Sequence, residues 1–362
     1  MKNSLVICCD GTWNSADQVT KDGNPCVTNV LKLAVRTKKI KSDGSLQIVY
    51  YDQGVGTGNA ADRLLGGAFG DGLVGNVIDA YRFLIANYDP GDDIYIFGFS
   101  RGAYTARCIA GMVRRCGILK RESVRKYVEA QRIYRTAKTA DAPEAVAFRK
   151  ENAIEDDTPI RCIGVWDTVG ALGIPLQAFQ MLNKQKYEFL DVRLTRAATF
   201  AFQALAVDEH RRPFEPSLWD WDEKVPPNPS QTIKQVWFAG AHSDVGGGYA
   251  EPGLSDIAFN WMMRSADSAG LEFDQEVVDK LGTNEKFDQD VHDSRTPLYK
   301  VQPALQRKIG ATKYSTEYFH RSLLQRWRAL PKYRPEPLKE YEKRIESLLA
   351  GSMTDEIYPV TG

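Results

Sequence analysis

Ser100 stands in the pentapeptide Gly98-Phe99-Ser100-Arg101-Gly102, a spacing typical of a serine that attacks a carbonyl carbon. A strand-like apolar run, Asp93 to Phe99, precedes the serine, and a helix-like run with small residues follows it. The serine of such a turn projects its hydroxyl above the sheet, and the flanking glycines avoid collisions with neighbouring backbone. The pattern predicts a nucleophilic serine, with the N–H of Arg101 as a first oxyanion donor at the helix N-terminus.

A nucleophilic serine needs a base, and the chain has four histidines. His242 follows the apolar run Ile233 to Ala239 and opens a glycine-rich segment that ends at Tyr249. The other histidines lie in polar or charged surroundings and are expected to be structural; they are His210, His292 and His320. We therefore predict that His242 is the base.

The third member of a triad is an acid that orients the histidine. Asp167 ends the apolar run Ile160 to Trp166, where a carboxylate is unfavourable without a partner. Its position also fits the order serine, acid, histidine of α/β-hydrolases. Asp208 and Asp244 are the alternatives, and for Asp244 we favour the interpretation that it caps its own loop.

A second oxyanion donor usually comes from the loop after an earlier strand. That loop is Asp10-Gly11-Thr12-Trp13-Asn14, in which Thr12 could donate its N–H or its hydroxyl. Asp10 and Gly11 are expected to support this turn. The alternative is an ordinary strand-to-turn connection in which Asn14 bonds to nearby backbone.

Two other kinds of site stay open. Asp10, Asp167, His242 and Asp244 could hold a divalent ion in a metal-assisted phosphohydrolase. The glycine-rich loops could instead bind phosphate or a nucleotide without catalysis. The segment Gly70 to Gly75 matches GxGxxG literally, but no strand leads into it, so we interpret it as the entry to a helix.

Five apolar runs are expected to form the strands that position these residues. They are Ser4 to Cys9, Leu46 to Tyr51, Asp93 to Phe99, Ile160 to Trp166 and Ile233 to Ala239. Segments with helical period alternate with them, the clearest ending at Tyr88. The pattern predicts an α/β fold of the α/β-hydrolase kind, with a mostly parallel sheet and helices on both faces. Polar or glycine-containing segments follow each run, so one crevice at the carboxyl ends of the strands is expected.

We expect a catalytic domain over residues 1–270 and a polar C-terminal extension over 271–362, packed on or beside it. Helical insertions at about 118–157 and 176–221 are expected to cover the sheet as a lid. Four apolar residues of the second insertion could form a rim that meets a bilayer, or could simply pack onto the sheet. They are Phe214, Leu218, Trp219 and Trp221.

Composition narrows the class of protein. The 362 residues include 47 basic and 47 acidic side chains, so no overall charge attracts nucleic acid, and we expect no nucleic-acid partner. Six cysteines without metal-binding spacing predict reduced core residues, no metal and no cofactor. The start of the chain is too short and too weakly apolar for a signal peptide, and no run is long enough to span a bilayer. A cytoplasmic chain, exported if at all by a leaderless route, is expected.

Together these motifs resemble one family, the phospholipase effectors of type VI secretion and their uncharacterised bacterial and fungal hydrolase relatives. The motifs lie between Ser4 and Met263 and include Tyr51 to Thr57, Val165 to Val169, Asp208-Glu209 and His242 to Tyr249. The resemblance implies a triad of Ser100, Asp167 and His242, an acyl-enzyme intermediate and cleavage of phospholipid esters. It also implies transient contact with a membrane surface and, for an effector, a secretion-machinery or immunity partner. The short polar C-terminal part departs from the effectors, so a soluble ester stays open as the substrate.

Overall fold

The computed structural model describes residues 2–11, 19–20, 22–54, 66–170, 194–220, 228–295, 297–300 and 303–361, without the side chains of 66–71 and 297–298. Its strands form one eight-stranded sheet in the order β2-β1-β3-β4-β5-β6-β7-β8. All neighbouring strands are parallel except β7 and β8. The strands are β1 (Ser4–Cys9), β2 (Gln47–Asp52), β3 (Asp93–Phe99), β4 (Ile160–Trp166), β5 (Ala198–Ala206), β6 (Thr232–Phe238), β7 (Glu317–His320) and β8 (Ile357–Pro359).

The predicted α/β fold with a mostly parallel sheet is confirmed, and the five predicted strands are β1, β2, β3, β4 and β6. One expectation is wrong. Ala198–Ala206 was assigned to a helical insertion but is β5, which lies between β4 and β6. Four alanines occupy this strand, and alanine favours helices, so the sequence hides a strand that tertiary packing imposes.

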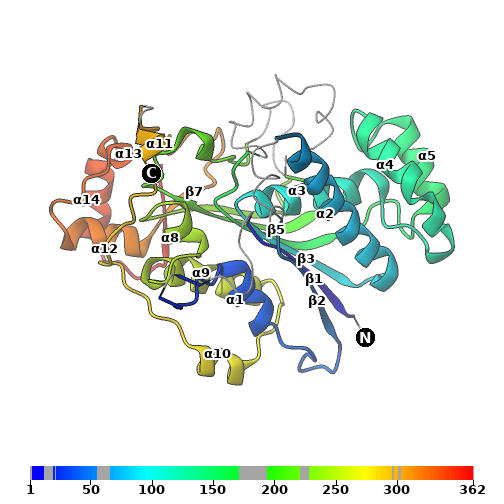
Figure 1. Cartoon of the computed structure of the whole chain (residues 1–362), viewed down its shortest axis with the longest axis horizontal. Coiled ribbons are helices and arrows are strands. Elements are labelled where there is room, and N and C mark those ends of the chain that lie inside the picture. Colours follow the sequence, from blue (N-terminus) through cyan, green and yellow to red (C-terminus); the bar gives the residue numbers. More distant parts are fainter. Residues whose placement is uncertain are drawn as a thin grey trace.

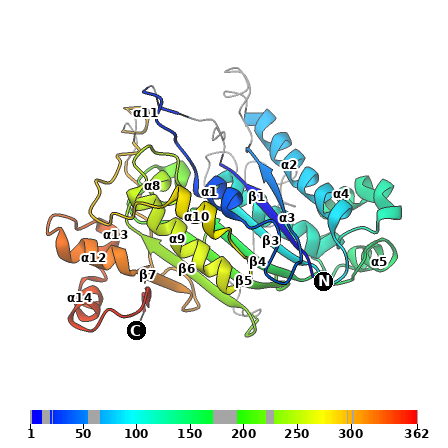
Figure 2. The same cartoon turned by 90° about the horizontal axis from the view of Figure 1, so that it is seen from below.

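Helices cover both faces of the sheet (Figures 1 and 2). On one face lie α2 (Gly66–Asn87), α3 (Arg101–Cys116), η1 (Arg121–Lys126), α4 (Tyr127–Thr136) and α5 (Pro143–Asn152). On the other lie α1 (Asn29–Arg36), α8 (His242–Gly246), α9 (Gly253–Ser268) and α10 (Gln275–Leu281). The expected segment 118–157 is indeed helical, since it contains η1, α4 and α5. Among the described residues, no helix is long and apolar enough to cross a membrane.

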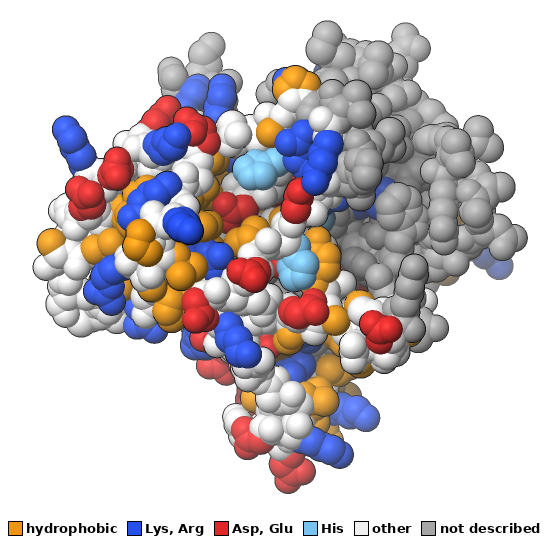
Figure 3. Space-filling view, turned by 60° about the vertical axis from the view of Figure 1, so that its left-hand side comes forward, with side chains coloured by type: hydrophobic (Ala, Val, Ile, Leu, Met, Phe, Trp, Pro, Cys, Tyr) orange, Lys and Arg blue, Asp and Glu red, His pale blue; other side chains and the backbone are white. Residues whose placement is uncertain are grey.

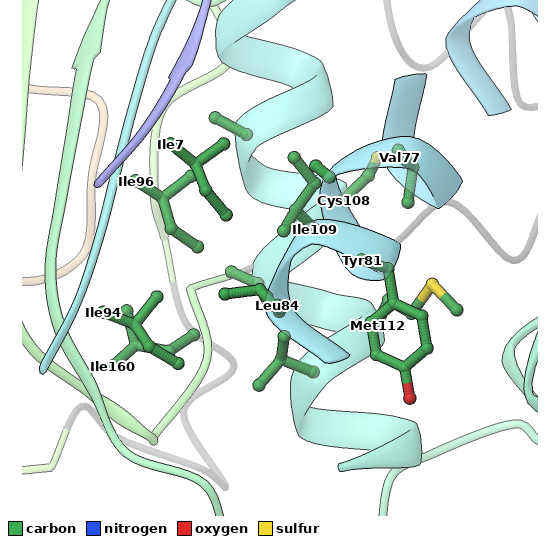
Figure 4. Packing of buried hydrophobic residues seen from close by; sticks show 14 of the residues in the cluster. Ile7, Val77, Tyr81, Leu84, Ile94, Ile96, Cys108, Ile109, Met112 and Ile160 are labelled. Carbon is green, nitrogen blue, oxygen red and sulfur yellow. The ribbon is translucent and has the colours of Figure 1, made fainter. Parts of the chain in front are cut away.

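The pleat of the strands divides the apolar core between the two faces. In β1, Leu5 and Ile7 belong to the cluster under α2 and α3, whereas Val6 and Cys8 belong to the cluster under α1 and α9. Figure 4 shows Ile7, Ile94 and Ile96 of neighbouring strands facing side chains of α2 and α3. Because both faces are buried, the strands read as continuous apolar runs rather than as alternating ones.

The C-terminal segment continues the same sheet. β7 pairs with β6 and β8 pairs with β7. The helices α12 (Arg321–Ala329), α13 (Glu336–Lys339) and α14 (Glu342–Ala350) follow, and η2 (Arg212–Phe214) and α11 (Pro297–Lys300) complete the described elements. A third core cluster joins residues of β5 and β6, such as Leu205 and Trp237, to Phe319, Leu323 and Trp327. This polar part of the sequence therefore shares the sheet and its core with the preceding residues.

The first turn of α3 lies directly against the end of β1. A Cβ atom on Gly102 would overlap the carbonyl oxygens of Cys9 and Asp10, and one on Gly98 would lie 2.7 Å from Cα of Ala103. The atoms in the way are backbone atoms of a strand and a helix, which cannot rotate aside. Both glycines are therefore required by the close approach of α3 to the sheet.

We expect Gly102→Ala to lower the free energy of unfolding by about 3 kcal/mol, because the added methyl group forces α3 away from β1. Gly75→Ala is the matched control, since Gly75 lies within α2 and a Cβ there meets nothing within 4 Å. That change should be neutral or stabilise by up to about 1 kcal/mol. Urea unfolding of both variants measures the difference, and equal stabilities would contradict the close contact.

Candidate active site

Ser100 sits at the sharp turn between β3 and α3. Its backbone has φ 59° and ψ −123°, a strained conformation for a residue with a side chain, and its N–H donates to the carbonyl of Trp166 at 3.0 Å. The helix begins at Arg101, so the N–H groups of its first turn and the positive end of its dipole lie beside the hydroxyl. This geometry is that of a nucleophile elbow.

Three of the predicted residues form one chain of hydrogen bonds. Nε2 of His242 lies 2.7 Å from Oγ of Ser100, and Nδ1 of His242 lies 2.6 Å from Oδ2 of Asp167. The tautomer that satisfies both bonds carries its proton on Nδ1, so the ring donates to the carboxylate and accepts from the hydroxyl. The structure thus brings together side chains that are 142 and 75 positions apart in the sequence.

The carboxylate of Asp167 is completely buried and fully bonded. Oδ1 accepts from the N–H of Ala206 at 3.0 Å and from Nη1 of Arg307 at 2.5 Å, while Oδ2 accepts from His242 and from Nη2 of Arg307 at 2.9 Å. Burial by itself would raise the pKa of Asp167. The charge of Arg307 and the bonds from His242 and Arg307 outweigh burial, so the pKa lies well below its usual range. The carboxylate is therefore ionised in the folded protein.

The imidazole of His242 is held neutral by its surroundings. It is buried between the rings of Phe99 and Phe214, whose centroids lie 4.6 and 4.9 Å away. Burial lowers the pKa of His242, and the hydrogen bond and charge of Asp167 reverse only part of that shift. A neutral imidazole that accepts from a serine hydroxyl is the state that a general base requires.

Asp208 and Asp244, the alternatives for the acid, bond to backbone around His242 instead of to its ring. Asp208 accepts from the N–H of Gly240 at 2.7 Å and from the hydroxyl of Tyr333 at 2.7 Å. Asp244 accepts from the N–H of Ala241 at 2.9 Å and lies 2.6 Å from Nδ1 of His292. These bonds fix the turn that leads into α8, which is the loop-capping interpretation of Asp244.

Sequence reasoning missed two charged residues beside His242. Glu209 is buried, accepts from the N–H of His242 at 3.3 Å and binds Arg211 through two bonds of 2.9 and 2.8 Å. Burial raises the pKa of Glu209, but Arg211 outweighs burial and brings it to about 2. The guanidinium of Arg211 lies 3.5 Å from the ring centroid of Phe214, so this arginine is part of the wall of the site.

Asp10 lies at the end of β1 and organises the turn that follows. Its carboxylate accepts from Thr28 at 2.5 Å, from Tyr51 at 2.7 Å and from the N–H of Gly11 at 2.6 Å. Burial raises the pKa of Asp10 to about 6, although these bonds oppose the shift. Thr12, the expected second oxyanion donor, lies outside the described residues.

The residues of the alternative metal site do not form one cluster, since only Asp167 and His242 of the four are in contact. Asp10, Asp167 and Asp244 each have separate partners, and the described part of the chain contains no group of three or more His, Cys, Asp or Glu arranged to hold a metal ion. The GxGxxG segment, Gly70 to Gly75, lies inside α2 and is no strand-to-helix loop. Neither alternative gains support from the geometry.

Of the two interpretations of these apolar residues, packing onto the sheet and not a bilayer-facing rim holds for Trp219. This side chain is buried, its backbone bonds to Gln235 on β6, and the guanidinium of Arg107 lies 5.1 Å from its ring. Phe214 packs edge-on against His242, and Leu218 is partly buried against the third core cluster. Trp221 lies outside the described residues. The described aromatic residues of this segment are thus packing residues.

Comparisons with known proteins place the chain in a family. A family model described as "T6SS, Phospholipase effector Tle1-like, catalytic domain" matches residues 3–265. The uncharacterized protein YEL023C of Saccharomyces cerevisiae is 31% identical over 193 residues, which are 47% of this chain and 27% of that protein. The chain therefore matches only about a quarter of the length of this relative.

Two solved structures are also similar. An uncharacterized protein from Pseudomonas aeruginosa superposes with a TM-score of 0.50 at 16% identity, over 78% of this chain and 49% of that chain. The Tle1 effector bound to the VgrG spike of the type 6 secretion system has a TM-score of 0.38 at 21% identity, over 68% of this chain and 51% of that chain. The first likeness concerns the fold alone.

The raised pKa of Asp10 gives a pH-dependent stability. Folding favours the protonated carboxyl, so its contribution is fully present below the unfolded pKa, near 3.9, and is lost as the pH rises through about 6. The shift of roughly two units amounts to about 3 kcal/mol. We expect Asp10→Asn to become more stable relative to the wild type by most of that amount between pH 4 and pH 8. Denaturant unfolding at several pH values measures this change, and a pH-independent difference would contradict it.

Proposed function

Because the chain belongs to the family of Tle1-like catalytic domains of type VI secretion phospholipase effectors, we propose that it is a serine hydrolase that cleaves carboxylic ester bonds of phospholipids. The observation that carries the proposal is the chain of hydrogen bonds from Ser100 through His242 to Asp167, at 2.7 and 2.6 Å. The strained backbone of Ser100 at the start of α3 supports the same assignment.

In the proposed reaction, Oγ of Ser100 attacks the ester carbonyl carbon while Nε2 of His242 takes the hydroxyl proton. The ester carbonyl oxygen becomes an oxyanion. Nδ1–H remains bonded to Asp167, whose negative charge stabilises the imidazolium as it forms. The imidazolium then gives its proton to the departing alcohol oxygen, and the acyl group stays on Ser100.

Water completes the proposed cycle. His242 takes a proton from the water, whose oxygen attacks the acyl carbon, and the same proton returns to Oγ of Ser100 as the fatty acid leaves. The N–H of Arg101 at the start of α3 is the first proposed donor to the oxyanion in both halves. Thr12 remains the proposed second donor on the grounds of sequence alone.

The phospholipid is the part of the proposal that depends on the family. Acidic and basic side chains are interspersed on the face that carries the C-terminal helices, in keeping with a formal net charge of zero (Figure 3). Binding to a bilayer would then depend on local contacts rather than on a field of one sign. A secretion-machinery or immunity partner is proposed only for the case in which the chain is delivered as an effector.

Loss of the proposed nucleophile should stop turnover. We expect Ser100→Ala to lower the release of fatty acid from phospholipid vesicles, and the hydrolysis of a water-soluble short-chain ester, by at least about 10⁴-fold. Ser268→Ala is the control, because Ser268 is an exposed serine at the end of α9. A fluorophosphonate should label Ser100 in the wild type. Normal turnover by Ser100→Ala would end the serine mechanism, whereas wild-type activity on the soluble ester alone would end only the phospholipid proposal.

Asp167→Asn should reduce kcat by about 10⁴-fold, because an amide favours the wrong tautomer of His242 and cannot stabilise the imidazolium. Asp208→Asn and Asp244→Asn should be much milder, since their carboxylates bond to the backbone near Gly240 and Ala241. Steady-state kinetics on the soluble ester compare the three variants. If Asp244→Asn proved the most damaging, the assignment of the acid would be wrong.

A further inference from the structure

Arg307 is a side chain of the C-terminal segment that reaches the site. Its guanidinium is completely buried and donates hydrogen bonds to both carboxylate oxygens of Asp167. Nη1 lies 2.5 Å from Oδ1, and Nη2 lies 2.9 Å from Oδ2. We propose that Arg307 is a positioning residue that keeps the Asp167 carboxylate ionised and correctly oriented toward His242. This inference rests on the proposed serine mechanism.

The contacts of Arg307 fix more than the acid. Nη1 also donates to the carbonyl of Ala206, and Nη2 donates to the carbonyl of Phe214, both at 2.7 Å. The ring of Phe214 packs edge-on against His242 with centroids 4.9 Å apart. A planar guanidinium that makes two parallel bonds resists rotation of the carboxylate. Arg307 therefore holds both the acid and one wall of the imidazole.

The segment that carries Arg307 is anchored on both sides. The N–H of Leu305 donates to the carbonyl of His210 at 2.8 Å, and Ile309 belongs to the third core cluster with Leu205. Arg307 also lies beyond residues 3–265, which the family model matches. Residues outside the matched catalytic domain thus supply one component of the site in this chain.

The charge of Arg307 affects the pH at which His242 takes up a proton and can no longer act as the base. Asp167 and His242 titrate as a coupled pair, and a cation in contact with the pair opposes the uptake of a proton by either member. Among the described residues, the other charged groups that act on His242 are Glu209, which favours the imidazolium, and Arg211, which opposes it. These groups remain when Arg307 is replaced, so the apparent pKa of the pair must rise.

The test compares Arg307→Met, Arg307→Lys and Arg326→Met with the wild type in the full chain. Arg326 is a matched control, because it is a buried arginine of the same segment whose Nη1 donates to the carbonyls of Phe287 and Gln289 at 2.7 and 2.6 Å. The rate of fluorophosphonate labelling of Ser100 is measured against pH. Nitrogen NMR of the four histidines measures the titration of His242 independently of turnover.

We expect Arg307→Met to move the acidic limb of the labelling profile, and the titration of His242, upward by about one pH unit or more. Arg307→Lys keeps the charge and should leave the limb in place while slowing the plateau rate about tenfold, because an ammonium group cannot hold both carboxylate oxygens as a fork. Arg326→Met should not move the limb.

A folded Arg307→Met protein with the wild-type limb would overturn the proposal, as would an equal shift in Arg326→Met. If thermal melting shows that Arg307→Met does not fold, the Arg307→Lys variant becomes the test. A wild-type plateau rate of labelling in Arg307→Lys would then overturn the proposal. Absence of labelling at Ser100 in the wild type would instead refute the proposed function. The titration of His242 would still test Arg307 in that case.

Discussion

The buried carboxylate of Asp167 imposes the strictest demand on this structure. An ionised carboxylate without solvent is tolerated only if charges and donors replace its lost hydration. Its donors come from the end of β5, from α8 and from the segment before β7, through Ala206, His242 and Arg307. One negative charge thus requires three distant parts of the chain to meet at the end of β4. The φ of 41° at Asp167 shows that the backbone accepts strain to place that charge there.

The strand order places the end of β6 far from Ser100, and α8 brings His242 back to the serine. Ser100 and Asp167 follow the neighbouring strands β3 and β4, but β5 separates β4 from β6, which leads to His242. At about 4.8 Å per strand, the end of β6 lies roughly 14 Å from that of β3. The chain returns across this gap because α8 packs onto Phe99. A Cβ on Gly246 would overlap the ring of Phe99, so a glycine is required for the imidazole to reach the serine.

The sequence could predict the features that depend on residues close together in the chain. The strand-to-helix context of Ser100 and the buried runs β1, β3 and β4 are local, and the fold class follows from their alternation. β5 was not predicted because alanine is typical of helices. Trp219 was a candidate for the apolar rim because the burial of a side chain is decided by the tertiary fold. Arg307 left no signal at all, since the partner of this arginine lies 140 positions away in the chain and nothing near it is unusual.

The charges around His242 come in neutral pairs, and this arrangement explains why the imidazole of this proposed base is neutral. Asp167 is matched by Arg307, and Glu209 is matched by Arg211, so neither carboxylate acts on the imidazole with its full charge. Burial therefore prevails, and the ring stays neutral before the reaction. Unpaired carboxylates in the same places would stabilise the imidazolium already in the resting protein, and the proposed base would be lost. In the proposed mechanism, the two arginines thus allow a buried site with two carboxylates to keep a proton acceptor. The fixed carboxylate of Asp167 would remain in contact with Nδ1 when positive charge develops on the ring.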